Sequence, residues 1–242
     1  MSEYAIEVEN LRISYKGLKS YSIKKNLLLG KWSKHTTFEA LKGISFQLRK
    51  GEILGIVGKN GSGKSTLLKA IGGIFTPDSG SVDLHGNTVS LLAIGVGFLK
   101  ELSGRDNVLL SGMLLGFTKE EILSKMDEII AFSELGEFMD KPVRTYSSGM
   151  YSKLSFAVTA ILETDIILID EVLSVGDSRF RRKSYAKMKE LISKKNRTVI
   201  IVSHDRKAIT DLCDKVLWIN DGQMKQFGET AEVLKAYDAF MK

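Results

Sequence analysis

A glycine-rich stretch of the sequence has the residues and spacing of a phosphate-binding loop. It reads GKNGSGKST and directly follows an apolar run, Ile53–Val57. The pattern G-x-x-x-x-G-K-[ST] lets backbone N–H groups close around nucleotide phosphates at the start of a helix. Lys64 is expected to neutralise the β- and γ-phosphates, and the hydroxyl of Ser65 to ligate Mg²⁺. The predicted nucleotide-binding residues are Gly58, Lys59, Asn60, Gly61, Ser62, Gly63, Lys64, Ser65 and Thr66.

Two carboxylates and a histidine follow other apolar runs. Asp170 and Glu171 end the run IILIDE, where we expect Asp170 to hold the metal and Glu171 to act as general base on the attacking water. His204 ends VIIVSHD. Ligands of α/β proteins bind at the carboxyl edge of the sheet, so His204 is predicted to contact the γ-phosphate and orient Glu171 or the water. Elsewhere, a lone histidine would more often be structural.

The elements that must position these residues form an α/β pattern. Apolar β-branched runs such as DIILID, RTVIIVSH and KVLWIND show little polar alternation, which indicates strands buried on both faces. Helical patterns separate several of them, starting at Ser65, Ser147, Arg181, Asp205 and Glu229. The predicted fold is a phosphate-loop NTPase core with a mostly parallel sheet and an inserted helical subdomain. We expect one domain over 1–242, with a core of about 1–90 and 160–242, a basic insertion at 16–38 and a helical subdomain of about 91–160.

Composition limits the classes of partner. The chain has 242 residues and a net charge of +6, which gives nucleic acid no special weight as a partner. Its single cysteine, Cys213, cannot form an internal disulfide and is expected in the core. The most apolar stretch, Asn107–Phe117, is much shorter than the ~20 residues of a spanning helix. Any role at a membrane is therefore expected to require a partner.

Five motifs in order resemble those of the ATPase subunits of ABC transporters: the phosphate loop, TYSSGMYSKLSF, IDE, SVGD and the strand-end histidine. The resemblance covers essentially the whole chain. It implies ATP and Mg²⁺ as ligands, ATP hydrolysis, and a two-fold dimer that sandwiches two ATPs. Ser147, Ser148 and Gly149 would bind the γ-phosphate on the second copy, and Asp177, in SVGD, would also be one of the nucleotide-binding residues. By itself, YSSG would be read as an ordinary helix cap.

The same resemblance assigns adenine stacking to an aromatic residue. Tyr15, in LRISYKG, stands where family members place that ring, and Phe38 is the substitute candidate. Plain packing of Tyr15 is the alternative. Tyrosine suits a stacking role because its ring is apolar and its hydroxyl remains solvated.

Departures from the family pattern point to one branch. Met150 replaces the usual Gln of the signature, Ser148 replaces a Gly, and no Gln occurs between Gln47 and Gln223. The family's glutamine loop must lie near Ala93–Gly95. Together with FSELGEFMDKPVRTYSSGM and LLLGKW, these features resemble the ATPases that export lipid-linked cell-surface polymers, above all teichoic acid. O-antigen, capsule or rhamnan-type export is the alternative, and a soluble ABC-type ATPase without a permease is a more distant one.

This branch implies a polytopic membrane permease, expected in two copies, with the chain peripheral at the cytoplasmic face of the cell membrane. The segment KKNLLLGKWSK contains Leu28, Leu29 and Trp32 between lysines. We expect it to dock on the permease, because such apolar surface is costly to leave in water, at ~25 cal/mol per Å². The alternative is that it folds back onto the chain's own core.

Overall fold

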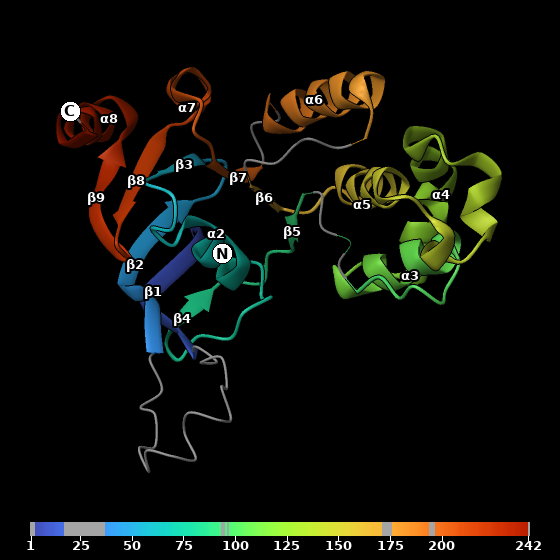
Figure 1. Ribbon diagram of the computed structural model, residues 1–242, viewed down its shortest axis with the longest axis horizontal. Helices are drawn as coiled ribbons and strands as arrows, with labels where there is room; N and C mark the ends of the chain where they lie inside the picture. Colours follow the sequence, from blue (N-terminus) through green and yellow to red (C-terminus); the bar gives the residue numbers. More distant parts are fainter. Residues whose placement is uncertain are drawn as a thin grey trace, which may run out of the picture.

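The computed structural model describes residues 3–16, 37–92, 95, 97–170, 176–193 and 197–241. Within these ranges the chain forms a six-stranded sheet, a three-stranded sheet and helices that pack against them (Figure 1). The segment predicted to dock on a permease, with Leu28, Leu29 and Trp32, lies outside the described residues.

The larger sheet is mostly parallel. Its order is β5-β6-β7-β3-β8-β9, in which all neighbours pair in parallel except β9, which runs antiparallel to β8. This arrangement confirms the predicted α/β fold with a mostly parallel sheet. The strands are β3 (Ile53–Val57), β5 (Val89–Leu91), β6 (Ile166–Ile169), β7 (Thr198–Val202), β8 (Lys215–Asn220) and β9 (Gln223–Glu229).

The central strands are buried on both faces, as their sequences predict. Every residue of β6 and β7 is buried. Leu168 and Ile200 pack into the hydrophobic core on one side of the sheet, whereas Ile167 and Ile201 pack into the core on the other. Because side chains alternate along a strand, two apolar layers require an unbroken apolar run.

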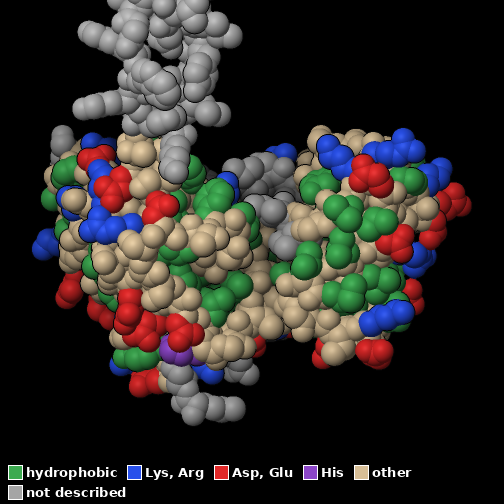
Figure 2. All heavy atoms as spheres, turned by 90° about the horizontal axis from the view of Figure 1, so that it is seen from below, with side chains coloured by type: hydrophobic (Ala, Val, Ile, Leu, Met, Phe, Trp, Pro, Cys, Tyr) green, Lys and Arg blue, Asp and Glu red, His purple; other side chains and the backbone are tan. Residues whose placement is uncertain are grey.

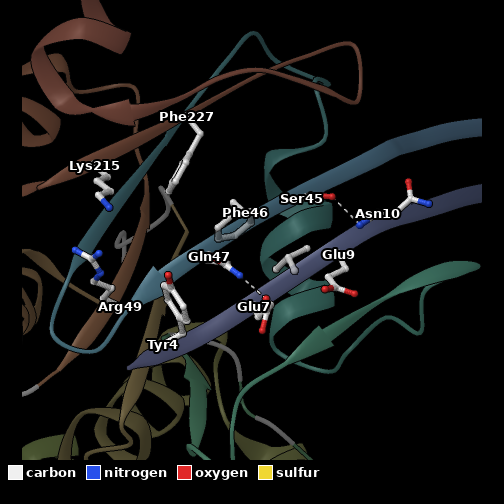
Figure 3. Close-up of a pocket in the computed structure, with 11 residues that line it drawn as sticks. Tyr4, Glu7, Glu9, Asn10, Ser45, Phe46, Gln47, Arg49, Lys215 and Phe227 are labelled. Carbon is white, nitrogen blue, oxygen red and sulfur yellow. Dashed lines mark hydrogen bonds between the residues drawn. The ribbon is translucent and has the colours of Figure 1, made fainter. Parts of the chain in front are cut away.

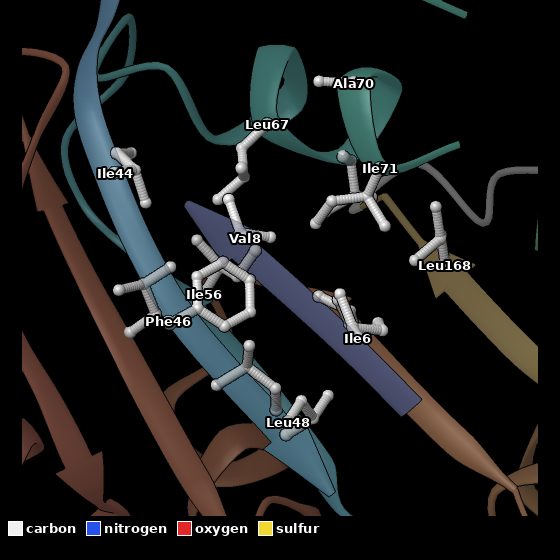
Figure 4. Packing of buried hydrophobic residues seen from close by; sticks show 14 of the residues in the cluster. Ile6, Val8, Ile44, Phe46, Leu48, Ile56, Leu67, Ala70, Ile71 and Leu168 are labelled. Carbon is white, nitrogen blue, oxygen red and sulfur yellow. The ribbon is translucent and has the colours of Figure 1, made fainter. Parts of the chain in front are cut away.

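The smaller sheet is antiparallel and consists of β1 (Tyr4–Lys16), β2 (Thr37–Arg49) and β4 (Ser79–Asp83), in the order β2-β1-β4. Val8 of β1 lies opposite Phe46 of β2. Both side chains share a core with α2 (Lys64–Ile71) and the parallel sheet, as Figure 4 shows. The sequence pattern had not separated this sheet from the parallel one.

Three helices cover the other face of the parallel sheet: α6 (Ser178–Ser193), α7 (Arg206–Leu212) and α8 (Thr230–Met241). They contribute Phe180, Ile209 and Val233, among others, to the second core. Helix α6 begins three residues before the predicted start, Arg181. The reason is that the Asp177 carboxylate accepts hydrogen bonds from the first N–H groups of the helix and caps it there.

A separate group of helices, here called the helical lobe, lies to one side of the sheets (Figure 1). It comprises α3 (Gly104–Leu114), α4 (Lys119–Ser133), the 3₁₀ turns η1 (Gly136–Asp140) and η2 (Val143–Thr145), and α5 (Ser148–Leu162). Leu154 and Ile161 of α5 belong to the core of the lobe, whereas Phe156 belongs to the core against the sheet. Helix α5 therefore joins the two parts. The predicted limits of an inserted subdomain, 91–160, stay a prediction.

Two further expectations concern burial and length. Cys213 is buried, which confirms its place in the core, and burial, assisted by the neighbouring Asp214 charge, raises the pKa of its thiol to about 12. Across the described ranges, none of the helices combines the length and apolar composition needed to cross a bilayer.

Candidate nucleotide-binding site

The phosphate loop joins β3, which lies between β7 and β8 in the sheet, to the start of α2. Gly63 immediately precedes α2 and has a φ of 106°. A Cβ atom at this position would lie 2.6 Å from the carbonyl oxygen of Ala40. Both the left-handed backbone and this contact require glycine. The loop thus leads into a helix whose first N–H groups have no partner within the helix and can bind phosphate oxygens.

Lys64 is buried within the loop. Its ammonium donates hydrogen bonds to the carbonyl oxygens of Gly58, at 2.8 Å, and Lys59, at 3.0 Å. The turn between β8 and β9 supports the loop, because the N–H of Gly222 donates to the carbonyl oxygen of Ser62 at 3.0 Å. The Lys64 ammonium therefore lies where the backbone curves around the space for an anion, which fits phosphate groups.

The remaining loop residues differ in exposure. Lys59, Asn60, Gly61 and Ser65 are exposed, and Thr66 is half-buried. The ammonium of Lys59 lies 5.0 Å from the centroid of the Phe240 ring in α8, a cation–π contact. The Ser65 hydroxyl in the first turn of α2 is accessible to a metal ion.

The carboxyl ends of β3, β6 and β7 bring the other predicted residues to the same edge of the sheet. Asp170 follows β6, and His204 follows β7 by two residues. Gly58 and His204, together with Arg206 and Tyr237, line one small cavity of about 50 Å³. The structure thus places His204 beside the phosphate loop, as predicted from its position at a strand end. Glu171 lies outside the described residues.

The donor atoms at this edge fit a hard cation. Ser65 offers a hydroxyl oxygen and Asp170 a carboxylate, which are ligand types that Mg²⁺ prefers. No cluster of three or more His, Cys, Asp or Glu that could hold a metal occurs in the part of the chain that the structure describes. Mg²⁺ at phosphate sites commonly takes one or two protein ligands and completes its shell with phosphates and water.

Tyr15 and Phe38 lie opposite each other in the pairing of β1 with β2, so both aromatic candidates are neighbours. The Tyr15 hydroxyl and the Thr66 hydroxyl are 3.2 Å apart, which ties Tyr15 to the start of α2. Tyr15 also packs edge-on against Phe75, at 6.0 Å between ring centroids. The side chain of Phe38 is 61% exposed and that of Tyr15 39% exposed. Either ring is available for a base beside the loop.

The residues of the signature begin α5 in the helical lobe. Ser147 is the N-cap, and its hydroxyl accepts a hydrogen bond from the N–H of Met150 at 3.2 Å. In Figure 1, α5 lies to the right of β5 and β6, whereas α2 lies to their left. Within one chain the structure does not bring Ser147, Ser148 and Gly149 to the phosphate loop.

Asp177 lies near the signature rather than the loop. Ser147, Gly149 and Asp177, with Lys153 and Gly176, line one hollow of about 330 Å³. A hydrogen bond from Lys153 and those from the N–H groups at the start of α6 lower the pKa of the Asp177 carboxyl to about 2. The carboxylate is therefore ionised over the whole physiological range.

A wider groove of about 610 Å³ lies between β1, β2 and β9 (Figure 3). Two of its polar side chains, Gln47 and Glu7, are joined by a hydrogen bond from Gln47, and Arg49 pairs with Glu3, which does not line the groove. Lys215, at the amino end of β8, pairs with Glu52. Because β8 runs parallel to β3, this groove lies at the opposite edge of the sheet from the phosphate loop. It is separate from the candidate site.

Comparison with known proteins identifies the family. A family model described as ABC transporter matches residues 41–174. The chain is 42% identical over 239 residues to the teichoic acids export ATP-binding protein TagH of Staphylococcus epidermidis, covering 98% of this chain and 89% of that protein. This chain belongs to the ABC transporter family.

Two further similarities extend the comparison. The chain is 49% identical over 198 residues to the O-antigen export system ATP-binding protein RfbB of Myxococcus xanthus, covering 82% of this chain and 45% of that protein. It thus spans about half the length of some curated relatives. The dimeric structure of a post-hydrolysis state of the ATP-binding cassette MJ0796, bound to ADP and Pi, has a TM-score of 0.67 at 21% identity and covers 93% of this chain and 98% of that one. It supports the fold.

The family's glutamine loop corresponds to the segment near Ala93–Gly95, which contains no glutamine. Ala93 and Ile94 lie outside the described residues. Gly95 lies against α5, because a Cβ atom there would be 2.8 Å from both the Tyr151 hydroxyl and the Ser155 hydroxyl. The absence of a side chain at Gly95 lets this segment approach the signature helix.

Lys153 and Glu134 lie at the signature hollow and were missed by sequence reasoning. Lys153 binds Asp177 at 2.9 Å and lies 3.7 Å from Glu134. One signal could have found Lys153, since it is the single charged residue in the otherwise apolar or neutral sequence of α5. Glu134 ends α4 in a left-handed conformation, and its sequence context gives no such signal.

Gly63→Ala is expected to destabilise the protein more than Gly73→Ala, its matched control. Both glycines have positive φ, which costs about 1–2 kcal/mol for a residue with a Cβ atom. Only Gly63 would also place that atom against a carbonyl oxygen, whereas Gly73 faces open space. Urea unfolding of the two variants measures the difference. Equal losses of unfolding free energy would mean that the contact with Ala40 relaxes freely.

Proposed function

We propose that this chain is the ATP-binding and ATP-hydrolysing subunit of an exporter of a lipid-linked cell-surface polymer, and that the polymer is teichoic acid. The observation that carries the proposal is the match along nearly the full chain to a protein named for teichoic acid export. The loop geometry supports it, because Lys64, Gly63 and the start of α2 form a cradle for phosphates.

The predicted site residues take distinct parts in this reaction. Lys64 exchanges the carbonyl oxygens of Gly58 and Lys59 for β- and γ-phosphate oxygens. Ser65 and Asp170 hold Mg²⁺, which when bound neutralises charge on the phosphates and on the leaving group. His204, beside Gly58, contacts the γ-phosphate. Glu171, directly after Asp170, orients the attacking water and takes its proton.

A second copy of the chain completes the site. Ser147–Gly149 lie at the start of α5, which is separated by β5 and β6 from α2, the helix that follows the phosphate loop (Figure 1). The N-terminus of a helix attracts anions, so this turn suits the γ-phosphate bound by another copy. A two-fold dimer places both signatures on the opposite ATPs at once. The ATP-binding cassette MJ0796, which is similar in fold, has a dimeric structure in a post-hydrolysis state bound to ADP and Pi.

Export also requires a membrane permease, with two copies expected, and places this subunit at the cytoplasmic face. Leu28, Leu29 and Trp32 remain our proposed contact through the basic insertion. A second surface is visible on the helical lobe, where exposed apolar side chains gather (Figure 2). Met113 and Leu114 at the end of α3 are 51% and 58% exposed. Burying such side chains in a partner is favourable at ~25 cal/mol per Å².

Glu171→Gln is expected to preserve ATP binding and stop turnover. The amide keeps the shape of the side chain but cannot accept the proton, and loss of a general base costs about 10²–10⁴-fold. Phosphate release measures hydrolysis, and size-exclusion chromatography with ATP detects the trapped dimer. Glu120→Gln, on the exposed face of α4, is the control and should keep normal turnover. Near-normal hydrolysis by the Glu171→Gln variant would reject the role.

Tyr15→Ala and Phe38→Ala separate the two aromatic candidates. A base–aromatic stack is worth about 1–3 kcal/mol, so the variant that loses it should bind ATP roughly tenfold or more weakly. We expect this result for Tyr15→Ala, and little change for Tyr15→Phe, which keeps the ring. Tyr185→Ala, half exposed on α6, is the matched control. Titration with a fluorescent ATP analogue gives the affinities. A loss confined to Phe38→Ala would transfer the role to Phe38.

Depletion of the protein in its host tests the polymer. Lipid-linked teichoic acid is expected to accumulate, because synthesis continues while export stops. Mass spectrometry of the lipid-linked glycans identifies the species. Accumulation of an O-antigen, capsule or rhamnan-type glycan instead would favour the alternative suggested by the similarity to the RfbB protein of Myxococcus xanthus. A normal glycan pool would exclude polymer export altogether.

A further inference from the structure

Lys153 stands out in the signature helix. It is the single charged side chain of α5, six residues after the N-cap Ser147, and the nine residues that follow it are all buried. Its own side chain is 15% exposed. A cation that is mostly withdrawn from water must be compensated by partners. Its partners define what the residue does.

The Lys153 ammonium binds the segment that leads into α6. It donates to Oδ2 of Asp177 at 2.9 Å. The other oxygen of the same carboxylate, Oδ1, accepts hydrogen bonds from the N–H groups of Arg179 and Phe180. The two oxygens thus have separate functions: Oδ1 caps α6, and Oδ2 holds α6 to the signature helix.

The stem of Lys153 is also enclosed. A Cβ atom at Gly176 would lie 2.9 Å from the Lys153 Cε, so the backbone of the segment packs directly on this side chain. The ammonium lies 5.0 Å from the centroid of the Phe180 ring. Lys153 therefore packs on Gly176 through its stem and pairs with the adjacent Asp177 through its ammonium.

The third side of the cluster is the end of α4. Glu134 lies 3.7 Å from Lys153 and 3.1 Å from Lys183. Lys183 of α6 additionally donates to the carbonyl oxygen of Phe132 at 2.9 Å, near the end of α4. Two carboxylates and two ammonium groups thus connect α4, α5 and α6. A network of this kind couples its members more strongly than isolated exposed pairs do.

We propose that Lys153 is a positioning residue that fixes Gly176 and Asp177 relative to the signature turn, so that both form one preassembled surface for the second copy. Ser147, Gly149, Gly176 and Asp177 line the same hollow, and Lys153 lies between them. This inference rests on the proposed function, because the surface matters only if two copies close on ATP. The phosphate loop contains none of these residues.

Three variants test the charge of the Lys153–Asp177 pair separately from the packing around it. Lys153→Met removes the ammonium and keeps an unbranched apolar stem against Gly176 and Phe180. Asp177→Asn removes the opposite charge and retains a good N-cap for α6. Lys153→Arg keeps the cation and should rescue the function. Lys125→Met is the matched control, because Lys125 forms an exposed pair with Glu128 on α4.

The readouts separate positioning from stability. The ATP affinity of each variant is measured under conditions where the protein is monomeric. ATP-driven dimerisation is measured by analytical ultracentrifugation in the Glu171→Gln background. Phosphate release gives the turnover, and urea unfolding gives the stability. Lys153→Met and Asp177→Asn should bind ATP as the wild type does. Both should lose about tenfold in dimerisation and turnover, a typical size for coupled residues. The double variant should be no worse than either single one. Lys153→Arg and Lys125→Met should match the wild type.

Three results would overturn the inference. Normal dimerisation and turnover of both charge-removing variants would show that the pair positions nothing. If dimerisation and turnover fall only in proportion to the unfolding free energy, and Lys153→Arg does not restore them, Lys153 only stabilises the protein. If Lys153→Met fails to fold, Asp177→Asn alone decides between these outcomes. If the wild type neither hydrolyses ATP nor dimerises, the proposed function is wrong and the inference with it.

Discussion

Parallel pairing of β6, β7 and β3 is the constraint on which the candidate site depends. In a parallel sheet all carboxyl ends lie at one edge, so the phosphate loop lies at the same edge as a carboxylate and a histidine that are more than a hundred residues further along the chain. Parallel strands need crossovers on both faces, and this need explains why β6 and β7 are wholly buried. The apolar runs that form the sheet thus also determine the edge at which the candidate site lies.

Helix α5 holds the polar turn Ser147–Gly149 rigidly, away from the phosphate loop. Phe156 packs with Phe132 and Phe180 in the core against the sheet, while Leu154 and Ile161 pack in the core of the helical lobe. Because opposite sides of one helix are buried in two cores, the direction of its N-terminus is set by both. Tyr146 and Met150, on either side of the signature turn, also pack against the core of the helical lobe.

Local patterns predicted the parts of this protein that depend on neighbouring residues. The phosphate loop could be read from its glycines and Lys64, and β6 and β7 from unbroken apolar runs. Long-range pairings could not be read in the same way. The register of β1 against β2 shifts at several bulges, and nothing in YAIEVENL distinguishes an antiparallel partner from a parallel one. The early start of α6 depends on Asp177, for which the sequence predicts only nucleotide binding.

The ion cluster at Asp177 illustrates the same limit in physical terms. Lys153 and Asp177 are 24 residues apart, and Glu134 and Lys183 are 49 apart. No helical or strand period links such positions, so only the packing of α4, α5 and α6 brings them together. A charged residue inside an apolar helix does reveal that a partner must exist, because the cost of burying it alone is several kcal/mol. The sequence thus indicates that Lys153 needs an anionic partner, and the fold shows that Asp177 is that partner.

Lys64 shows how the site can be prepared for a ligand before it binds. Its ammonium is buried, and two backbone carbonyl oxygens of the loop accept its hydrogen bonds. The desolvation cost of the charge is therefore met within the folded protein rather than at the moment of binding. Under the proposed function, phosphate oxygens replace these neutral carbonyl oxygens, and hydrogen bonds between ionised partners are roughly twice as strong. The proposed contact would then gain from a cation that the fold already holds, and Gly63 and Gly222 support the loop that holds it.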